Sequence, residues 1–178
     1  MPLPVTHALV PVVGALAFVR GPIPWRLIAV APLAAMAPDI DSLNHHFAIS
    51  EGSMWAHRGL FHSLFIAVVA GTFVGGLHRA LRVKYLSAAA ATAVAMATHG
   101  ILDMMADRGL PVAYLWPLST TRLYADWRPI HSVGLQRSTP ILVALDRLGG
   151  ELLQVIVPLI AAAIVFRLIR AAKSRHCP

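Results

Sequence analysis

The stretch LSAAAATAVAMATHGILDMMA, residues 86–106, decides the fold that we expect for this chain. It is almost entirely apolar, and it is long enough for a helix to cross a hydrocarbon core of about 30 Å, which takes roughly 20 residues. His99 and Asp103 lie four residues apart near its end, so a helix places them on one face. An unpartnered ionisable group in such a helix is expensive. The stretch therefore predicts a membrane-spanning helix whose polar end meets a partner.

Four further apolar stretches accompany this helix, at about residues 3–19, 23–37, 60–77 and 152–170. The 178-residue chain is 57% hydrophobic and only 13% charged, against about a quarter charged in soluble domains. We therefore predict an all-α, polytopic helical membrane protein, a single integral membrane domain over residues 1–178 with about five hydrophobic segments. The first two segments are shorter and contain Pro11, Pro24 and Pro32, so they either tilt and kink or form a re-entrant hairpin.

The charges of the chain separate into two predicted faces. Fifteen Lys and Arg residues against eight Asp and Glu residues give a net charge of +7. Nine basic residues share one face: Arg20, Arg26, Arg79, Arg82, Lys84, Arg167, Arg170, Lys173 and Arg175. All eight acidic residues fall on the other: Asp39, Asp41, Glu51, Asp103, Asp107, Asp126, Asp146 and Glu151. The positive-inside rule makes the basic face and the C-terminus cytoplasmic in a plasma or inner membrane. We attribute the basicity to topology and expect no nucleic-acid partner.

Two loops, residues 38–59 and 107–151, form the predicted outer face. The second loop holds aromatic residues of types that favour the lipid headgroup level: Tyr114, Trp116, Tyr124 and Trp127. Its segment STPILVALDRLGG, residues 138–150, has a Ser/Thr cap, an early proline, apolar residues at helical spacing and a glycine stop. We predict a short interfacial helix there, in contact with membrane lipids.

Other metal-ligand side chains are predicted at the depth of His99 and Asp103. His7 lies at the outer end of the first stretch, Asp39 and Asp41 follow the second, and His62 lies one turn into the third. Four segments thus deliver imidazole or carboxylate groups to one level, which favours a single site for a divalent metal. The only cysteine, Cys177, is next to the end of the chain, so any metal must be held by nitrogen and oxygen ligands.

His57 and Arg58 belong to the approach to the third stretch. His57 is five residues from His62, so the two do not share a helical face, and we place His57 near the metal or the substrate. Arg58 could bind a phosphate oxygen through its planar fork of donors. Blander interpretations stay open: a structural His–Asp hydrogen bond in the fourth stretch, a solvated aspartate pair at residues 39 and 41, and an ordinary headgroup contact for Arg58.

The ordered motifs TH at 6–7, PDID at 38–41, HRGLFHS at 57–63 and HGILD at 99–103 resemble those of the YdjM-like family of membrane-bound metal-dependent hydrolases. The resemblance covers about residues 5–120. It departs at Phe61, where the family has threonine, and at Leu118, where a later family motif has an aromatic residue. The family is described as distantly similar to zinc-dependent phospholipase C and P1 nuclease. The resemblance implies metal binding by His7, Asp39, His62, His99 and Asp103, with Asp41 and His57 as further ligands or acid–base groups.

These observations lead to one main hypothesis. It is a membrane-bound hydrolase holding one to three zinc or manganese ions, which cleaves a lipid-borne or headgroup-like phosphoester with Asp41, His57 and Arg58 as catalytic residues. The rival is a non-enzymatic membrane protein in which the same ligands form a structural or transport site. A second enzymatic rival is a lipid phosphatase with a histidine nucleophile, for which Arg122, Arg128 and His131 are the candidates.

Overall fold

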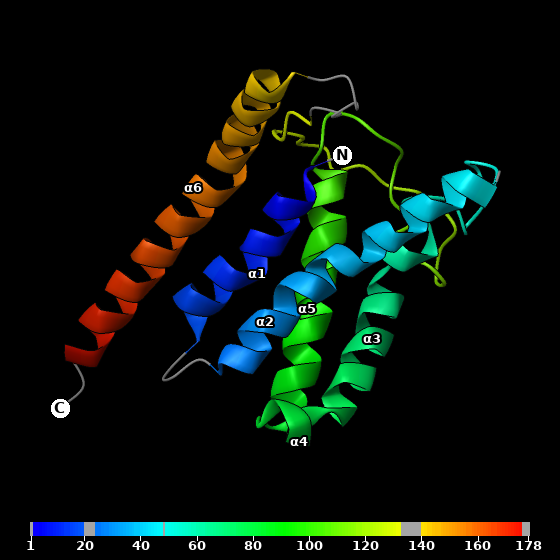
Figure 1. The fold of residues 1–178 in the computed structure, drawn as a ribbon. Coiled ribbons are helices and arrows are strands. Elements are labelled where there is room, and N and C mark those ends of the chain that lie inside the picture. The colour runs from blue at the N-terminus through cyan, green and yellow to red at the C-terminus, as the bar shows by residue number, and fades with distance from the viewer. Residues whose placement is uncertain (1, 20–23, 48, 133–139, 176–178) are drawn as a thin grey trace.

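The computed structural model describes the chain except residues 1, 20–23, 48, 133–139 and 176–178 (Figure 1). Arg20, Arg137, Cys177 and the predicted helix cap at Ser138 and Thr139 lie outside the described residues.

The described residues form helices and no named strands, which confirms the all-α prediction. The elements in chain order are α1 (Pro4–Phe18), α2 (Trp25–Met36), η1 (Ala37–Phe47), η2 (Leu60–His62), α3 (Leu64–Gly76), α4 (His78–Leu81), α5 (Tyr85–Met104) and α6 (Ile141–Arg175), where η marks a 3₁₀-helix. Two of them contain stretches long and apolar enough to cross a membrane, Tyr85–Met104 and Ile141–Arg170. The apolar segments of α1 and α3 are shorter, so the count of five membrane segments stays a prediction.

The long outer loop was predicted to end at residue 151, but helix α6 already begins at Ile141. The expected interfacial helix and the fifth apolar stretch are one continuous helix, α6, which runs through Gly149 and Gly150. A glycine inside a helix costs only about 1 kcal/mol relative to alanine, and neither glycine here is needed for a left-handed turn. Similarly, much of the first loop is the 3₁₀-helix η1 rather than irregular chain.

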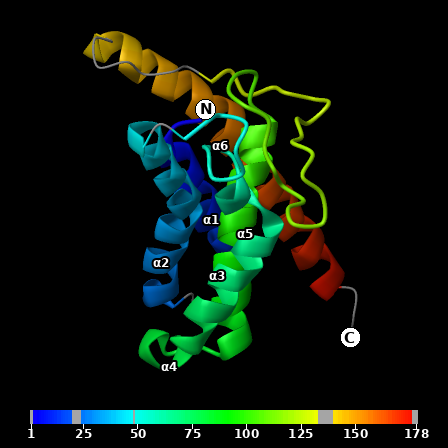
Figure 2. The ribbon, with the colours of Figure 1, turned by 90° about the vertical axis from the view of Figure 1, so that its right-hand side faces the viewer.

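Helix α5 is the centre of the bundle, packed against α3, α2 and α1, while α6 lies along α1 (Figures 1 and 2). The contact between α3 and α5 depends on small residues. A Cβ on Gly71 would lie 2.6 Å from the Ala89 carbonyl oxygen, and one on Gly75 would lie 2.8 Å from the Tyr85 ring. Such close approach is typical of helices that pack in membranes. It fixes the start of α3 beside the end of α5.

The start of α3 differs from the prediction in one respect that matters for the site. Ser63 is the N-cap, and its side chain accepts a hydrogen bond from the Ile66 amide at 3.2 Å. His62 therefore lies in η2, just before the helix, and not one turn inside it. Because His62 lies in the short 3₁₀ turn η2, the orientation of its side chain is not set by the helical geometry of α3.

The segment after α5 closes over the chain that precedes α3. The Ala113 amide donates to the Arg58 carbonyl oxygen at 3.0 Å, and the Leu64 amide donates to the Tyr114 carbonyl oxygen at 2.9 Å. Arg122 adds a clamp, because its guanidinium donates to the carbonyl oxygens of Ser53 at 2.6 Å and His57 at 3.2 Å. These contacts hold the HRGLFHS segment against the end of α5.

Candidate metal centre

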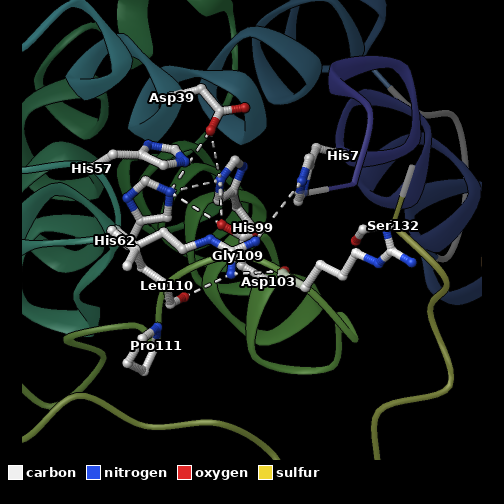
Figure 3. Close-up of polar contacts among 12 residues, drawn as sticks. His7, Asp39, His57, His62, His99, Asp103, Gly109, Leu110, Pro111 and Ser132 are labelled. Atoms are coloured by element: carbon white, nitrogen blue, oxygen red, sulfur yellow. Dashed lines mark hydrogen bonds and ion pairs between the residues drawn. The ribbon is translucent and has the colours of Figure 1, made fainter. Parts of the chain in front are cut away.

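The predicted ligands converge at the end of the bundle that carries the N-terminus (Figures 1 and 3). Asp39, His62, His99 and Asp103 bring one ligand atom each into a group within 4.8 Å of one another, and a second group contains Asp41, His57 and His62. Three separate elements supply the first group: η1, η2 and α5. Side chains from distant segments thus lie together in the structure, while their role as metal ligands stays a prediction.

The spacing of the first group is that of a metal coordination shell. His62 Nε2 lies 3.0 Å from His99 Nε2 and 3.3 Å from Asp103 Oδ2. Asp39 Oδ1 lies 3.7 Å from His62 Nε2 and 3.4 Å from His99 Nε2, and the distance from His99 Nε2 to Asp103 Oδ2 is 3.7 Å. Four ligands bound tetrahedrally at about 2.05 Å would be about 3.3 Å apart. The donor set therefore fits a small divalent cation such as zinc.

Several polar atoms of the centre are buried without a hydrogen-bond partner among the described residues. They are both carboxylate oxygens of Asp39, Oδ2 of Asp103 and both ring nitrogens of His7. Buried polar groups are normally paired, so such a cluster points to a partner of another kind. With the imidazoles neutral, as metal ligands must be, the three aspartates against the one guanidinium of Arg58 give the centre a net charge of −2, which a divalent cation would neutralise.

The aspartates act strongly on the imidazole of His62. Burial disfavours its charged form, yet contacts with Asp103, Asp39 and Asp41 raise the pKa of His62 to about 10. Burial likewise opposes the ionisation of Asp39, but the imidazoles of His62 and His99 hold its pKa well below the usual range. The carboxylates that favour the protonated form of His62 would likewise stabilise a cation placed among them.

His99 is oriented as a metal ligand by the backbone. Its Nδ1 lies 2.7 Å from the Ala35 carbonyl oxygen, at the end of α2. A carbonyl oxygen can only accept, so Nδ1 carries the proton and Nε2 keeps its lone pair toward Asp39 and His62. Outer contacts of this type fix the tautomer of ligating histidines.

Asp39 and Asp41 lie two residues apart on the 3₁₀-helix η1, and they contact opposite ring nitrogens of His62, Nε2 and Nδ1 respectively. Successive residues on such a helix are about 120° apart, so the two carboxylates point in different directions. Asp41 Oδ1 lies 2.6 Å from His57 Nδ1, and its Oδ2 lies 3.0 Å from His62 Nδ1. Asp41 thus joins the two histidines and is itself only 1% exposed.

His7 lies beside the first group rather than within it. Its ring stacks on that of His99 with the centroids 3.8 Å apart, and its Nε2 is 3.9 Å from Asp103 Oδ1. Figure 3 shows His7 facing the cluster from α1. Its position is compatible with a further ligand or with support for His99.

Arg58, for which the sequence suggested a phosphate contact, does not face water. The side chain is fully buried, with Nη2 donating to Asp103 Oδ1 at 2.8 Å and Nη1 donating to the Leu110 carbonyl oxygen at 2.7 Å. Gly109 makes room for it: its φ is +105°, and a Cβ there would lie 2.5 Å from Arg58 Nη1. The guanidinium is committed to the protein, and it holds Asp103 in place.

Sequence reasoning missed the partners that surround the ligands. No sequence motif marks these partners, because they are backbone carbonyl groups, which every residue has. They include the carbonyl oxygens of Ala35 and Leu110 and those that Arg122 contacts. The glycine at 109, next to a loop and shortly after Asp103, was the one available signal. The Arg122 guanidinium donates to backbone carbonyl oxygens. This weakens the histidine phosphatase alternative, in which Arg122 was a candidate site residue.

The chain is similar to known inner membrane proteins. No solved structure matches the chain. The inner membrane protein YbcI of Escherichia coli K12 is 35% identical over 133 residues, which cover 73% of this chain and 76% of YbcI. Residues 1–174 match the family described as YdjM inner membrane protein. An inner-membrane location accords with the two helices that are long and apolar enough to span a bilayer. The chain belongs to the YdjM inner membrane protein family.

Proposed function

We propose that this protein is a membrane-bound metal-dependent hydrolase that cleaves a phosphoester of a lipid or of a headgroup-like molecule. The observation that carries the proposal is the set of four ligand atoms from Asp39, His62, His99 and Asp103 in a buried, negatively charged centre. Five of their six pairwise distances are 3.0 to 3.7 Å, and all four atoms lie within 4.8 Å of one another. Two imidazoles with two carboxylates suit zinc, and the carboxylates also suit manganese.

A divalent cation held by these residues would act as a Lewis acid, stabilising charge on a phosphoryl oxygen and making water a stronger nucleophile at neutral pH. The protein's own groups have distinct tasks. Asp41 orients His57 through the contact of 2.6 Å, and His57 is the most exposed of the four clustered histidines, at 9%. His57 is therefore placed to exchange a proton at the edge of the centre. Arg58 positions Asp103 and does not contact the substrate.

A lipid-borne substrate is supported by the surface around the centre. Large apolar side chains are exposed on the same outer segments, including Phe47 at 73%, Trp55 at 59% and Trp127 at 71%. Aromatic rings of this kind favour the headgroup region of a bilayer. A distant relationship to phospholipase C and P1 nuclease would account for phosphoester chemistry at a cluster of histidines and aspartates, and it forms part of this proposal.

The experiment uses the full chain purified in detergent. We expect about one or more equivalents of zinc or manganese, and cleavage of phosphodiester or phospholipid substrates that a chelator abolishes. Asp39→Asn and His99→Ala should each lose metal and activity. His131→Ala is the matched control, because His131 is an exposed histidine that contacts Gln154 outside the cluster.

Two outcomes would reject this function. A correctly folded preparation without stoichiometric metal would reject the metal centre. Loss of activity in His131→Ala, with a trapped phosphohistidine, would instead favour the histidine phosphatase.

A structural or transport site for a divalent cation is the second candidate. It is favoured by the burial of the ligands, since His99 and Asp103 are both 0% exposed. A clip predicts that His99→Ala unfolds the protein while His57→Ala leaves every property unchanged. Uptake of the metal into liposomes that contain the protein would favour transport.

A further inference from the structure

An apolar crevice of about 850 Å³ lies within the bundle, away from the metal centre. Its walls come from four helices, and they include Val10 of α1, Leu27 of α2, Ala91 and Val94 of α5, and Leu159 of α6. The volume is in the range of about 300 to 1,000 Å³ typical of ligand sites. Two of these helices, α5 and α6, contain stretches long and apolar enough to cross a membrane, so lipid acyl chains are the expected surroundings of the crevice.

One end of the crevice is basic. Arg82 and Lys84, between α4 and α5, both line it, and both are exposed. Neither forms a salt bridge with any described residue. Residues 52–102 contain no acidic residue, nor do residues 1–38. The positive charge of Arg82 and Lys84 is therefore not balanced by any acidic residue in these two segments.

Arg82 is also held in an unusual conformation. Its φ is +56° at the C-cap of α4, a left-handed position that ordinarily favours glycine. A long cationic side chain stands there instead, beside the crevice. Such a backbone outlier is often found at functional positions.

The crevice is separated from the metal centre by packed alanines. Its inner end is formed in part by Ala31 and Ala95, which belong to the buried core together with Ala35. The Ala35 carbonyl oxygen is the partner of His99 Nδ1 on the far side of this core. An occupant that enters from the basic end would therefore meet Arg82 and Lys84 and would not reach the ligands.

We propose that this crevice binds an anionic phospholipid, with an acyl chain between α1, α2, α5 and α6 and the phosphate at Arg82 and Lys84. Two cations over an apolar cavity complement a molecule with a negative head and a hydrocarbon tail. A free phosphate would leave the apolar volume unfilled, and a zwitterionic lipid would leave the charge uncompensated. The site is distinct from the proposed hydrolytic centre and does not depend on its function.

The test measures lipid binding by native mass spectrometry of the full chain in detergent. The probes are phosphatidylglycerol and phosphatidylcholine with the same acyl chains, and inorganic phosphate. Arg82→Gln combined with Lys84→Gln removes the head site, whereas Ala91→Phe and Val94→Phe fill the crevice. Arg79→Gln is the control, because Arg79 is exposed at the same end and does not line the crevice. Metal content and helicity verify the fold of each variant.

We expect phosphatidylglycerol to bind at least tenfold more tightly than phosphatidylcholine. Each lost charge should weaken binding about fivefold, hence about twenty-fivefold in the double variant. At least one folded crevice-filling variant should weaken it with both charges in place, and Arg79→Gln should change it less than twofold.

Three results would overturn the proposal. An equal loss in Arg79→Gln would indicate general surface charge. Unchanged binding in both crevice-filling variants would indicate adsorption of the headgroup alone. Displacement of the lipid by millimolar inorganic phosphate would indicate a simple anion site.

Discussion

At the scale of single residues, the centre depends on one carboxylate, that of Asp41, which does not itself fall within the first ligand group. Asp41 contacts both His57 and His62. It orients the His62 ring without belonging to the first ligand group. Partners of this kind typically change metal affinity by about 10- to 100-fold when removed. The role of Asp41 is therefore separable from that of Asp39.

The substitution Asp41→Asn tests this separation. We expect the variant to keep stoichiometric metal at saturation but to bind it about 10- to 100-fold more weakly, because His62 loses an anionic partner. Asp39→Asn, which removes a ligand atom, should lower the stoichiometry itself. Isothermal titration calorimetry measures both quantities, and identical behaviour of the two variants would show that Asp41 is a direct ligand.

Arg58 yields a second prediction at this scale. Its buried ion pair with Asp103 leaves an uncompensated carboxylate when the arginine is removed, which costs about 3 to 5 kcal/mol. Arg58→Met should therefore lower the free energy of unfolding by that amount, measured in mixed micelles with the metal removed. The exposed Arg79→Met is the control and should change it by less than about 0.5 kcal/mol. A small effect at Arg58 would contradict its role in holding Asp103.

At the scale of helices, the close contact between α3 and α5 aligns His62 with His99 and Asp103. Gly71→Leu should push these helices apart and destabilise the protein by about 1 to 3 kcal/mol, because a side chain there meets the Ala89 carbonyl oxygen. The metal affinity should fall with it. Gly76→Leu is the matched control, since nothing lies within 4 Å of a Cβ at that glycine. Equal effects of the two variants would contradict this account of the packing.

The helices also show which features the sequence could predict. The spacing of His99 and Asp103 on an apolar helix predicted both the element and the position of its ligands, because helical periodicity is a local property. Burial of Arg58 depends on the carbonyl groups of Leu110 and Arg108, in a segment 50 residues away. No local pattern encodes such a contact. The continuity of α6 through Gly149 and Gly150 was missed because glycine only weakens a helix.

At the scale of the whole molecule, the chain divides its chemistry between two ends. The buried aspartates and histidines gather at one end, and the basic residues around α4 lie at the other (Figure 1). By the positive-inside rule the basic end should be cytoplasmic. Reporters fused after the final helix should therefore be active as cytoplasmic and inactive as periplasmic enzymes. The reverse pattern would place the metal centre inside the cell.

X-ray absorption spectroscopy of the zinc-loaded full chain reports the atoms bound to the metal, so it tests whether the cluster of histidines and aspartates holds the ion. We expect one tightly bound ion with nitrogen and oxygen neighbours at about 2.0 to 2.1 Å and the outer-shell signature of two imidazoles. His99→Ala should lose most of its zinc, and the zinc that it still binds at saturating concentration should show about half of that imidazole signature. Failure to retain stoichiometric zinc, or a first shell that is unchanged by the loss of His99, would show that this cluster does not bind the metal as we propose.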